Sequence, residues 1–406
     1  MSIEIRAVTP DEVADMIAAD HRGFGQAPNA FGTGSSAWSE GELDRTRVAF
    51  EDGAIVGVSR AYSFEVTLPG GALAPAAAVS WVSVVPTHRR RGILTQMMGA
   101  LHDDARTREE PAAILTASES VIYGRFGYGC ATSRVGYALE RTRAKFARPT
   151  GDTGRVRFVA REEAEKVLPA LYDQVRVARP GMVSRPDIWW SQIFWGLDKP
   201  DKAFFVVVHE NAAGVADGFA AYEVRGAWNR GIPNTTLWVE DIEATDDTAR
   251  GALWEFLLGV DLVDVVEGAR LPIDEPLRHW VADPRRVRVT FISDGLWLAP
   301  LDPQALLGAR TYSEFDGHVV LEVHAPDGSE LTLAVDGNAT GARCEPTSAA
   351  PDLVLNTATL GACLLGGNRF HDYAAAKAVE ERRPGALAYA DAMFAISPPP
   401  RMTSGF

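Results

Sequence analysis

The chain has 406 residues, of which 46% are hydrophobic, and a formal net charge of −14 that comes from 40 basic and 54 acidic side chains. This length predicts two or three domains with ample buried cores. The acidic balance argues against a general nucleic-acid binder, because such proteins neutralise phosphates with basic surfaces. Cationic partners are favoured instead, although the simpler interpretation is that the charge only keeps the protein soluble.

The sequence predicts neither a membrane segment nor a metal site. No run of about 18 apolar residues occurs, and the first residues lack the basic end and apolar core of a signal peptide, which predicts a soluble, cytoplasmic protein with no membrane partner. The three cysteines, Cys130, Cys344 and Cys363, have no metal-ligand or disulfide spacing and no nearby histidine. We expect them to be buried small residues, and we expect no metal.

In chain order, the first part of the sequence predicts a strand, a helix, a loop and a hairpin. Residues 2–7 alternate, Pro10 opens a helix, and the segment 21–42 that follows is rich in glycine and aromatic residues. Exposed rings on such a loop suggest a binding lid, so Phe24 and Trp38 are candidates for contacting a substrate. Packing of these rings under the loop is an equally good interpretation.

The segment 79–101 changes from a strand to a helix within a few residues. Val79 to Val85 alternate as the two faces of a strand do, and Pro86 ends the strand because it has no N–H group to donate. From Ile93 onward apolar residues recur at helical spacing. This spacing predicts an amphipathic helix that packs on the sheet.

The loop between this strand and helix is a candidate phosphate site. The first turn of a helix has unpaired N–H groups and the positive end of the helix dipole, and Gly92 lets the backbone approach a ligand closely. Arg89, Arg90 and Arg91 add guanidinium groups, which suit phosphate oxygens. The alternative is a solvated basic turn, which is what most isolated arginine runs are.

A second motif, Ile-Tyr-Gly-Arg-Phe-Gly-Tyr-Gly at residues 122–129, is punctuated by glycines. It follows a predicted apolar strand at residues 112–117. The glycines allow Tyr123 and Tyr128 to lie close to backbone and ligand at little steric cost. For Tyr128 a packed aromatic ring is the favoured interpretation.

These motifs resemble those of a known superfamily. The run Arg89-Arg90-Arg91-Gly92-Ile93-Leu94 resembles motif A of the Gcn5-related N-acetyltransferases (GNAT), Gln/Arg-x-x-Gly-x-Gly/Ala, with Leu94 departing at the last position. The tyrosine motif, with Ala-Ser-Glu before it, and the run Val-Pro-Thr-His-Arg-Arg-Arg-Gly resemble the Eis (enhanced intracellular survival) family of aminoglycoside acetyltransferases.

The resemblance implies a function for each motif. The loop would bind the pyrophosphate of acetyl-CoA, the strand before it would pair with the pantetheine arm, and Tyr123 would be the general acid. The implied cofactor contacts are Val82, Ser83 and Val84 in the strand, Arg89, Arg90, Arg91, Gly92, Ile93, Leu94 and Thr95 in the loop and helix start, and Ser118 and Glu119 before the tyrosine.

Residues 145–292 are expected to repeat this fold in a degenerate form. The segment from Arg155 echoes the first strand and helix of the chain, and the segment from Leu237 echoes the strand, loop and helix described above. Asp246 and Asp247 stand at the second phosphate loop, where two carboxylates would repel pyrophosphate. We therefore expect a GNAT-like domain that binds no cofactor, as the resemblance to Eis proteins also implies.

The last third of the chain predicts a small α+β domain. Strands are expected at residues 319–323 and 331–335, and helices at residues 357–365 and 373–380. By resemblance this is the sterol-carrier-like domain of Eis proteins. The expected fold class is therefore α+β and α/β, with tandem GNAT folds, the first active and the second degenerate, before a sterol-carrier-like domain. The expected domains are residues 1–144, 145–292 and 293–406.

The end of the chain, Ser-Pro-Pro-Pro-Arg-Met-Thr-Ser-Gly-Phe, would ordinarily predict a disordered tail. The resemblance implies the opposite, because Eis enzymes bring the terminal carboxylate of a C-terminal Phe into the N-terminal active site. Phe406 matches that residue. Gly405 departs from the acidic residue of the mycobacterial members, so the resemblance does not carry over one acidic contact to substrate.

The leading hypothesis is an Eis-like enzyme that moves the acetyl group of acetyl-CoA directly to an amine of an aminoglycoside-like or other polyamine. Tyr123 would be the general acid, the Phe406 carboxylate the base, and a small-molecule amine the partner. The alternatives are a protein-lysine or biosynthetic small-molecule N-acetyltransferase on the same scaffold, and a non-catalytic acyl-CoA sensor or lipid carrier. The resemblance alone implies a homohexamer.

Overall fold

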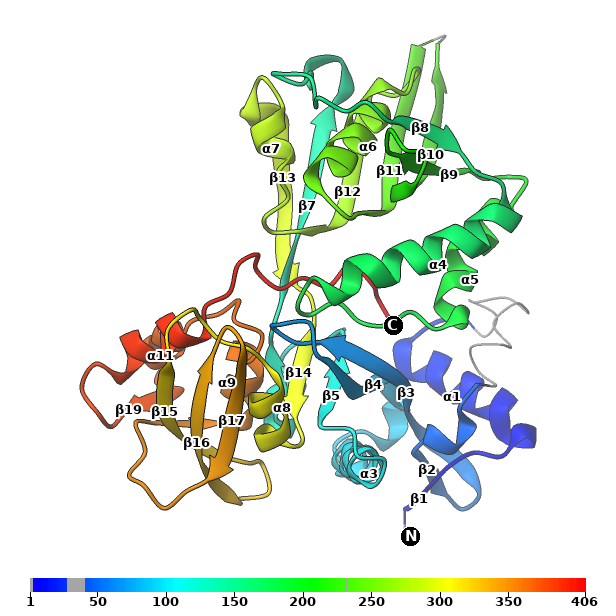
Figure 1. Ribbon diagram of the computed structural model, residues 1–406. Helices are drawn as coiled ribbons and strands as arrows, with labels where there is room; N and C mark the ends of the chain where they lie inside the picture. The colour runs from blue at the N-terminus through cyan, green and yellow to red at the C-terminus, as the bar shows by residue number, and fades with distance from the viewer. Residues whose placement is uncertain (1–2, 28–40, 231) are drawn as a thin grey trace. The chain divides into compact units, whose positions relative to one another are not determined.

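The computed structural model describes residues 3–27, 41–230 and 232–406, and the chain packs into two compact units (Figure 1). The first unit comprises the chain up to Ala131, the segment Leu296–Ile396 and Phe406. The second unit comprises Thr132–Gly295 and Ser397–Gly405. Each unit is therefore built from segments that are far apart in the sequence.

The first unit contains a seven-stranded mixed sheet that carries two long helices. In spatial order its strands are β1 (Glu4–Arg6), β2 (Val48–Glu51), β3 (Ala54–Thr67), β4 (Leu73–Val84), β5 (Ala112–Leu115), β14 (Trp297–Pro300) and β6 (Gly129–Cys130). The helices are α1 (Val13–Phe24) and α3 (Ile93–Thr107). The strand and helix predicted at residues 79–101 are thus confirmed as the end of β4 and the start of α3.

The two helices cover opposite faces of this sheet. Met16 and Ala19 of α1 pack in one apolar cluster with β2, β3 and the Trp81 side chain of β4. Met98 and Leu101 of α3 pack in another cluster with β3, β4 and β5. The helical spacing of these residues places them on one side of each helix, where burial of a large apolar side chain contributes about 1.5–3 kcal/mol.

The first unit also contains a separate five-stranded sheet with four short helices. Its strands in spatial order are β17 (Gly341–Pro346), β16 (Glu330–Asn338), β15 (Gly317–His324), β18 (Leu353–Asn356) and β19 (Val379–Glu381). The helices are α8 (Pro303–Ala309), α9 (Thr357–Cys363), α10 (Phe370–Ala375) and α11 (Ala386–Phe394).

The predicted helix at residues 373–380 is wrong beyond Ala375. Helix α10 ends at Ala375, Lys377 has a positive φ of 63°, and β19 then pairs with β18. A left-handed residue breaks the helical hydrogen-bond ladder, which frees the chain to add an edge strand. Of the three cysteines, Cys344 and Cys363 are buried as predicted, whereas Cys130 is only half-buried.

The second unit has a seven-stranded sheet of the same general plan. Its strands in spatial order are β13 (Val287–Asp294), β7 (Ser133–Glu140), β12 (Val265–Pro272), β11 (Ile232–Ala244), β10 (Ala216–Asn229), β9 (Ala203–Glu210) and β8 (Arg155–Phe158). Its helices are α4 (Arg161–Val177), α5 (Asp187–Leu197), α6 (Asp247–Gly259) and α7 (Leu277–Trp280).

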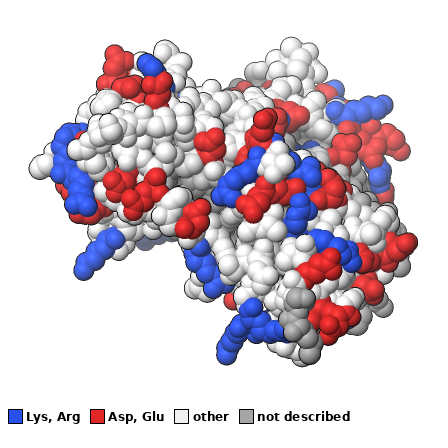
Figure 2. Space-filling model, turned by 90° about the horizontal axis from the view of Figure 1, so that it is seen from below, with Lys and Arg blue, Asp and Glu red and all other residues white. Residues whose placement is uncertain are grey.

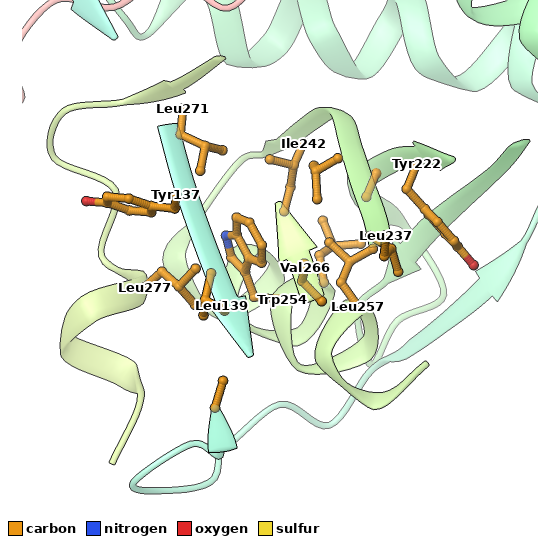
Figure 3. Packing of buried hydrophobic residues seen from close by; sticks show 14 of the residues in the cluster. Tyr137, Leu139, Tyr222, Leu237, Ile242, Trp254, Leu257, Val266, Leu271 and Leu277 are labelled. Carbon is orange, nitrogen blue, oxygen red and sulfur yellow. The ribbon is translucent and has the colours of Figure 1, made fainter. Parts of the chain in front are cut away.

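Trp254 of α6 lies at the centre of the larger core of this unit (Figure 3). It is fully buried among side chains of the sheet, including Leu237 and Val266, and its indole Nε1 donates to Glu275 Oε1 at 3.0 Å. Helices α4 and α5 cover the other face through a second cluster. The indole thus contributes apolar area while its one donor is satisfied.

Strands cross the expected domain boundaries. Strand β7, which lies within residues 1–144, pairs with β12 and β13 of the second sheet, and β14 pairs with β5 and β6 of the first sheet. The division at residues 144/145 and 292/293 stays a prediction about which segments fold independently. No helix in the described part of the chain is long and apolar enough to span a bilayer.

Candidate active site

The central strand of the first unit has an edge that is available to a ligand. Strand β4 pairs with β5 only through Ala76–Ala78, yet it continues to Val84 along β3. In the described part of the chain no strand pairs with residues 79–84 on the β5 side. The N–H and C=O groups of that edge can therefore pair with an extended ligand, as backbone groups of an added strand would.

A β-bulge shapes this part of β4. The register with β3 shifts so that both Trp81 and Val82 lie opposite one residue, and Trp81 has a φ of 55°. The bulge turns Trp81 toward the cluster under α1, while Val82 packs against the cluster that contains Tyr123. A bulge leaves an unpaired residue in the ladder and re-aims side chains, which suits a strand that must hold a ligand.

The predicted strand contacts all lie in this open segment. Val82 and Val84 are half-buried, and Ser83 is 8% exposed. The Ser83 hydroxyl donates to Asp20 Oδ1 at 3.0 Å, and Gly23 of α1 lies so close to Ser83 that no side chain would fit there. Helix α1 is therefore fixed directly against the strand.

The predicted phosphate loop leads into the open N-terminus of α3. Gly92 has a φ of 77° and precedes the helix without any side-chain cap. The first helical bond runs from Gln96 N to Gly92 O at 3.2 Å, so the N–H groups of Ile93, Leu94 and Thr95 have no partner within the helix. Together with the helix dipole these groups form a fitting cradle for a phosphate.

The three arginines of the loop have different surroundings. Arg89 donates to the carbonyl oxygens of Val84 at 3.2 Å and Gly23 at 2.8 Å, so it fastens the loop to β4 and α1. Arg91 forms a two-fold ion pair with Glu51, and this bond lowers the pKa of the Glu51 carboxyl below its usual value.

Arg90 is exposed and has a φ of 64°. Among the described residues no hydrogen bond or ion pair engages its guanidinium. Of the three arginines it is therefore the one whose charge is available to an incoming phosphate without breaking another bond.

Tyr123 lies in the apolar cluster beside the open strand. It begins a 3-10 turn after the exposed Ser118 and Glu119, and its side chain is 5% exposed. Burial raises the pKa of its phenol, the negative charge of Glu119 raises it further, and a hydrogen bond with Ser118 opposes the shift. The phenol therefore remains protonated at neutral pH and can donate a proton.

Tyr128 is a packed aromatic residue, as the sequence predicts. It is fully buried, its hydroxyl bonds His102 Nε2 at 2.9 Å, and its ring lies edge-on to that of Tyr123 with 5.9 Å between centroids. Burial lowers the pKa of His102 to about 4, which keeps the imidazole neutral. Tyr128 thus supports the position of Tyr123 from behind.

The last residue of the chain lies beside the end of β5. Thr116, which directly follows β5, donates from Oγ1 to one oxygen of the Phe406 terminal carboxylate at 3.2 Å. The Phe406 ring packs edge-on against Phe64 of β3 with 5.1 Å between centroids. The terminal carboxyl is therefore held at the edge where β4 and β5 separate.

Of the two candidate substrate contacts, Phe24 and Trp38, the structure describes only Phe24. Phe24 ends α1 and is 43% exposed, followed by Gly25 with a φ of 66°. Trp38 lies outside the described residues. Their role in a lid stays a prediction.

Sequence reasoning missed Asp20 as a residue of this site. It is 6% exposed on α1, and burial raises the pKa of its carboxyl to about 6, against the effect of the Ser83 hydrogen bond. A titratable carboxyl is thus attached to the open segment of β4. The available signal was an aspartate four residues after the buried Met16, on the apolar face of an amphipathic helix.

The corresponding loop of the second unit is closed by its own side chains. Asp246 accepts from Ala249 N at 2.9 Å and so caps α6, and Arg250 is buried in an ion pair with Glu275. A carboxylate at the helix start takes the position that an anion would take. Separately, the described residues contain no group of three or more His, Cys, Asp or Glu side chains that could hold a metal ion.

Comparisons with known proteins match this architecture. Residues 4–131 match a family model described as an acetyltransferase (GNAT) domain, residues 181–298 match a second model of the same description, and residues 303–403 match a sterol carrier protein domain. The predicted fold class, with two GNAT folds before a sterol-carrier-like domain, is thereby confirmed.

Relatives match over most of the chain. An uncharacterized N-acetyltransferase of Streptomyces coelicolor is 36% identical over 417 residues and covers 100% of both chains. N-acetyltransferase Eis of Mycobacterium tuberculosis is 34% identical over 368 residues, 87% of each chain. Among solved structures, Eis1 from Mycobacterium abscessus has a TM-score of 0.86 at 34% identity and covers 100% of both chains.

Proposed function

Because this chain belongs to the Eis family of N-acetyltransferases, within the GNAT superfamily, we propose that it acetylates amines of a small polyamine, with aminoglycoside-like compounds as the leading candidates. Acetyl-CoA is the acetyl donor that a GNAT fold implies. The observation that carries the proposal is the juxtaposition, in one unit, of an open β4 edge, a buried Tyr123 and the Phe406 carboxyl.

The residues of the first unit fit acetyl-CoA. The N–H groups at the start of α3 and the guanidinium of Arg90 would hold the pyrophosphate, and the open edge of β4 beside Val82 and Val84 would pair with the pantetheine arm. The exposed Ser118 and Glu119 lie in the chain between the end of β5 and Tyr123. When bound, the cofactor supplies an acyl carbon that a neutral amine can attack and a thiolate that must leave.

Tyr123 would be the general acid. An ordinary phenol has a pKa of about 10 and an ordinary thiol one of about 8.5. Burial raises the pKa of Tyr123, and it would raise the pKa of a thiol leaving beside it in the same way, so the mismatch for proton donation would stay modest. Burial and Glu119 keep the phenol protonated until that moment. Tyr128 and the surrounding apolar side chains exclude water from the proton that Tyr123 carries.

The Phe406 carboxylate would be the base. An α-carboxylate has an ordinary pKa of about 3.3–3.7, so it removes an ammonium proton efficiently only when it is shielded from water or acts through one bound water. The half-buried position against Phe64 and Thr116 supplies part of that shielding. Backbone N–H groups at the bulge of β4 would stabilise the oxyanion.

A test measures thiol release from acetyl-CoA with a panel of amines. We expect release with an aminoglycoside and with spermidine, and the background rate without an amine. Mass spectrometry of the product identifies acetylation on nitrogen. If a lysine peptide alone were acetylated, the protein-lysine alternative would replace the proposal. A homohexamer stays part of the proposal, to be measured by light scattering during chromatography.

A further inference from the structure

The proposed base belongs to a chain end, and a free chain end samples many positions. Fixing one residue costs about 1–2 kcal/mol, so a productive carboxylate needs neighbours that hold it. The structure describes such neighbours. Arg401, Met402, Thr403 and Ser404 are each at most 7% exposed, although they lie within six residues of the end.

Glu243 of β11 holds the first part of this tail. It is fully buried, accepts from Arg401 Nη2 at 2.5 Å through Oε2 and from Thr403 Oγ1 at 2.8 Å through Oε1. Both carboxylate oxygens are therefore used by the tail. A buried carboxylate without such partners would be costly, so this bond pattern fixes the tail backbone in one register.

Arg185 holds the second part of the tail. Its Nε donates to Ser404 Oγ at 2.6 Å, its Nη1 donates to Asp241 Oδ2 at 2.5 Å, and its guanidinium lies over the Tyr172 ring at 3.9 Å. The Trp189 indole then donates to the Gly405 carbonyl oxygen at 2.8 Å. The next residue is Phe406 itself.

Glu243, and Asp241 that holds Arg185, lie on the part of β11 that corresponds to the open edge of β4. Strand β11 pairs with β12 only through Thr236–Val239, and Asp241 and Glu243 lie beyond that pairing. The second unit therefore uses the segment where its central strands separate to bind the chain's own tail.

We propose that the second GNAT unit is a dock for the catalytic tail, with Glu243 and Arg185 as positioning residues that act on the reaction only through the Phe406 carboxylate. This inference rests on the proposed function of Phe406. It gives the unit whose phosphate loop is closed a role in the chemistry of the other unit.

The test uses substitutions on the tail. Ser404→Ala leaves Arg185 bonded to Asp241, and Arg401→Met leaves Glu243 with the bond from Thr403 while its Oε2 loses a partner. Arg401→Met removes the ion pair, and Ser404→Ala removes only a hydroxyl. We expect kcat to fall about tenfold or more for Arg401→Met and about two- to tenfold for Ser404→Ala, with the KM for acetyl-CoA unchanged. Hydrogen exchange of the backbone amides of residues 401–406 should quicken in both variants.

A double-mutant cycle separates positioning from a general structural effect. In a chain that lacks Phe406, the same two substitutions should cause no further loss of kcat, because their effect passes through the missing carboxylate. A general structural effect would lower kcat equally in both backgrounds and would overturn the inference. The matched control is Thr150→Val, which removes a threonine–glutamate hydrogen bond of the same unit, to Glu255, and should leave kcat unchanged.

Failure of the dock and failure of the proposed base are distinguishable. Full activity after deletion of Phe406 would refute the base and the dock together. Loss of activity after that deletion, with normal kcat in Arg401→Met and Ser404→Ala, would overturn the dock alone. If Arg401→Met does not fold, as judged by thermal unfolding, the kcat of Ser404→Ala alone distinguishes these outcomes.

Discussion

The two GNAT units have the same strand, loop and helix but differ in what occupies the ligand positions. In the first unit the start of α3 has no side-chain cap, and Arg90 is exposed. In the second unit Asp246 caps α6 and Arg250 is bound to Glu275. A binding site can therefore be closed without a change of fold, because a few side chains take over the partners that a ligand would have had.

Acidic and basic side chains are interspersed on the face shown in Figure 2. No continuous basic surface appears on that face. The surface charge alone thus does not distinguish the loop arginines, and their individual bonds do. The following experiments test the difference between the two units.

The largest effect is expected from changes to the chain end. Adding one or two residues after Phe406 converts its carboxylate into an amide and adds bulk beside Thr116. We expect loss of most turnover, about 10²–10⁴-fold as for other proton-transfer groups, with acetyl-CoA binding retained. The same extension placed before Met1 is the control. A fully active C-terminally extended protein would rule out the carboxylate as base.

Tyr123→Phe should have the next largest effect. As the proposed general acid, the hydroxyl would be needed only as charge develops on sulfur, so turnover should fall by up to about 10²–10⁴-fold while the Kd for acetyl-CoA stays nearly unchanged. Steady-state kinetics and calorimetry measure the two quantities. The second unit offers the control Tyr222→Phe, a tyrosine buried in its core. Near wild-type turnover in Tyr123→Phe would reduce Tyr123 to a packing residue.

The arginine comparison predicts an intermediate effect. Arg90→Ala would remove the proposed charge-assisted phosphate contacts, worth about 1.5–3 kcal/mol, so the Kd for acetyl-CoA should rise at least tenfold. Arg91→Ala should raise it less, because Arg91 is already paired with Glu51. Calorimetry should also give one equivalent of cofactor per chain. A second equivalent would contradict the closed loop at Asp246.

The smallest effect concerns His209 of the second unit, which lies between Asp217 at 2.5 Å and Asp152 at 3.1 Å. Burial alone would lower the pKa of His209, but the two carboxylates outweigh it and raise the pKa above its usual value. The protonated His209 therefore stabilises the fold. This stabilisation is fully present below the unfolded-state pKa of about 6.5 and is lost as the pH rises through the folded-state pKa.

His209→Gln should therefore flatten the pH dependence of the unfolding temperature above pH 6. At pH 6 the variant should unfold a few degrees below the wild type, and the difference should shrink toward pH 9. His371, an exposed histidine of the first unit that is also bonded to an aspartate, is the control position. Parallel pH profiles of His209→Gln and the wild type would contradict the assignment.

Structure that depends on neighbouring residues could be predicted from the sequence, whereas contacts between residues far apart in the chain could not. The alternation ending at Pro86 and the helical spacing from Ile93 are local patterns, and they correctly placed β4 and α3. The partner of Arg91 is 40 residues away on β2, so no local pattern could show that Arg91 is occupied and Arg90 is not. The open edge of β4 likewise depends on where β5 stops.

The tail shows the same limit more strongly. Its composition predicts disorder, and only the resemblance through Phe406 suggested otherwise. The bonds that bury it join Arg401 to Glu243, 158 residues away, and Ser404 to Tyr172, 232 residues away. A Pro-rich end becomes ordered when a distant surface satisfies its polar groups, and that surface is not visible in the tail's own sequence.

Strand β14 has a consequence for how the protein is made. It completes the first sheet between β5 and β6, yet it is Trp297–Pro300, and the whole of the second unit's Thr132–Gly295 is synthesised before it. At about 5–20 residues per second, β5 waits roughly 10–40 s for its neighbour while its edge stays unpaired. A nascent chain of this protein therefore exposes an unpaired, aggregation-prone strand edge while the middle of the chain is translated. Slow codons in that region would lengthen the time for which the chain needs a chaperone.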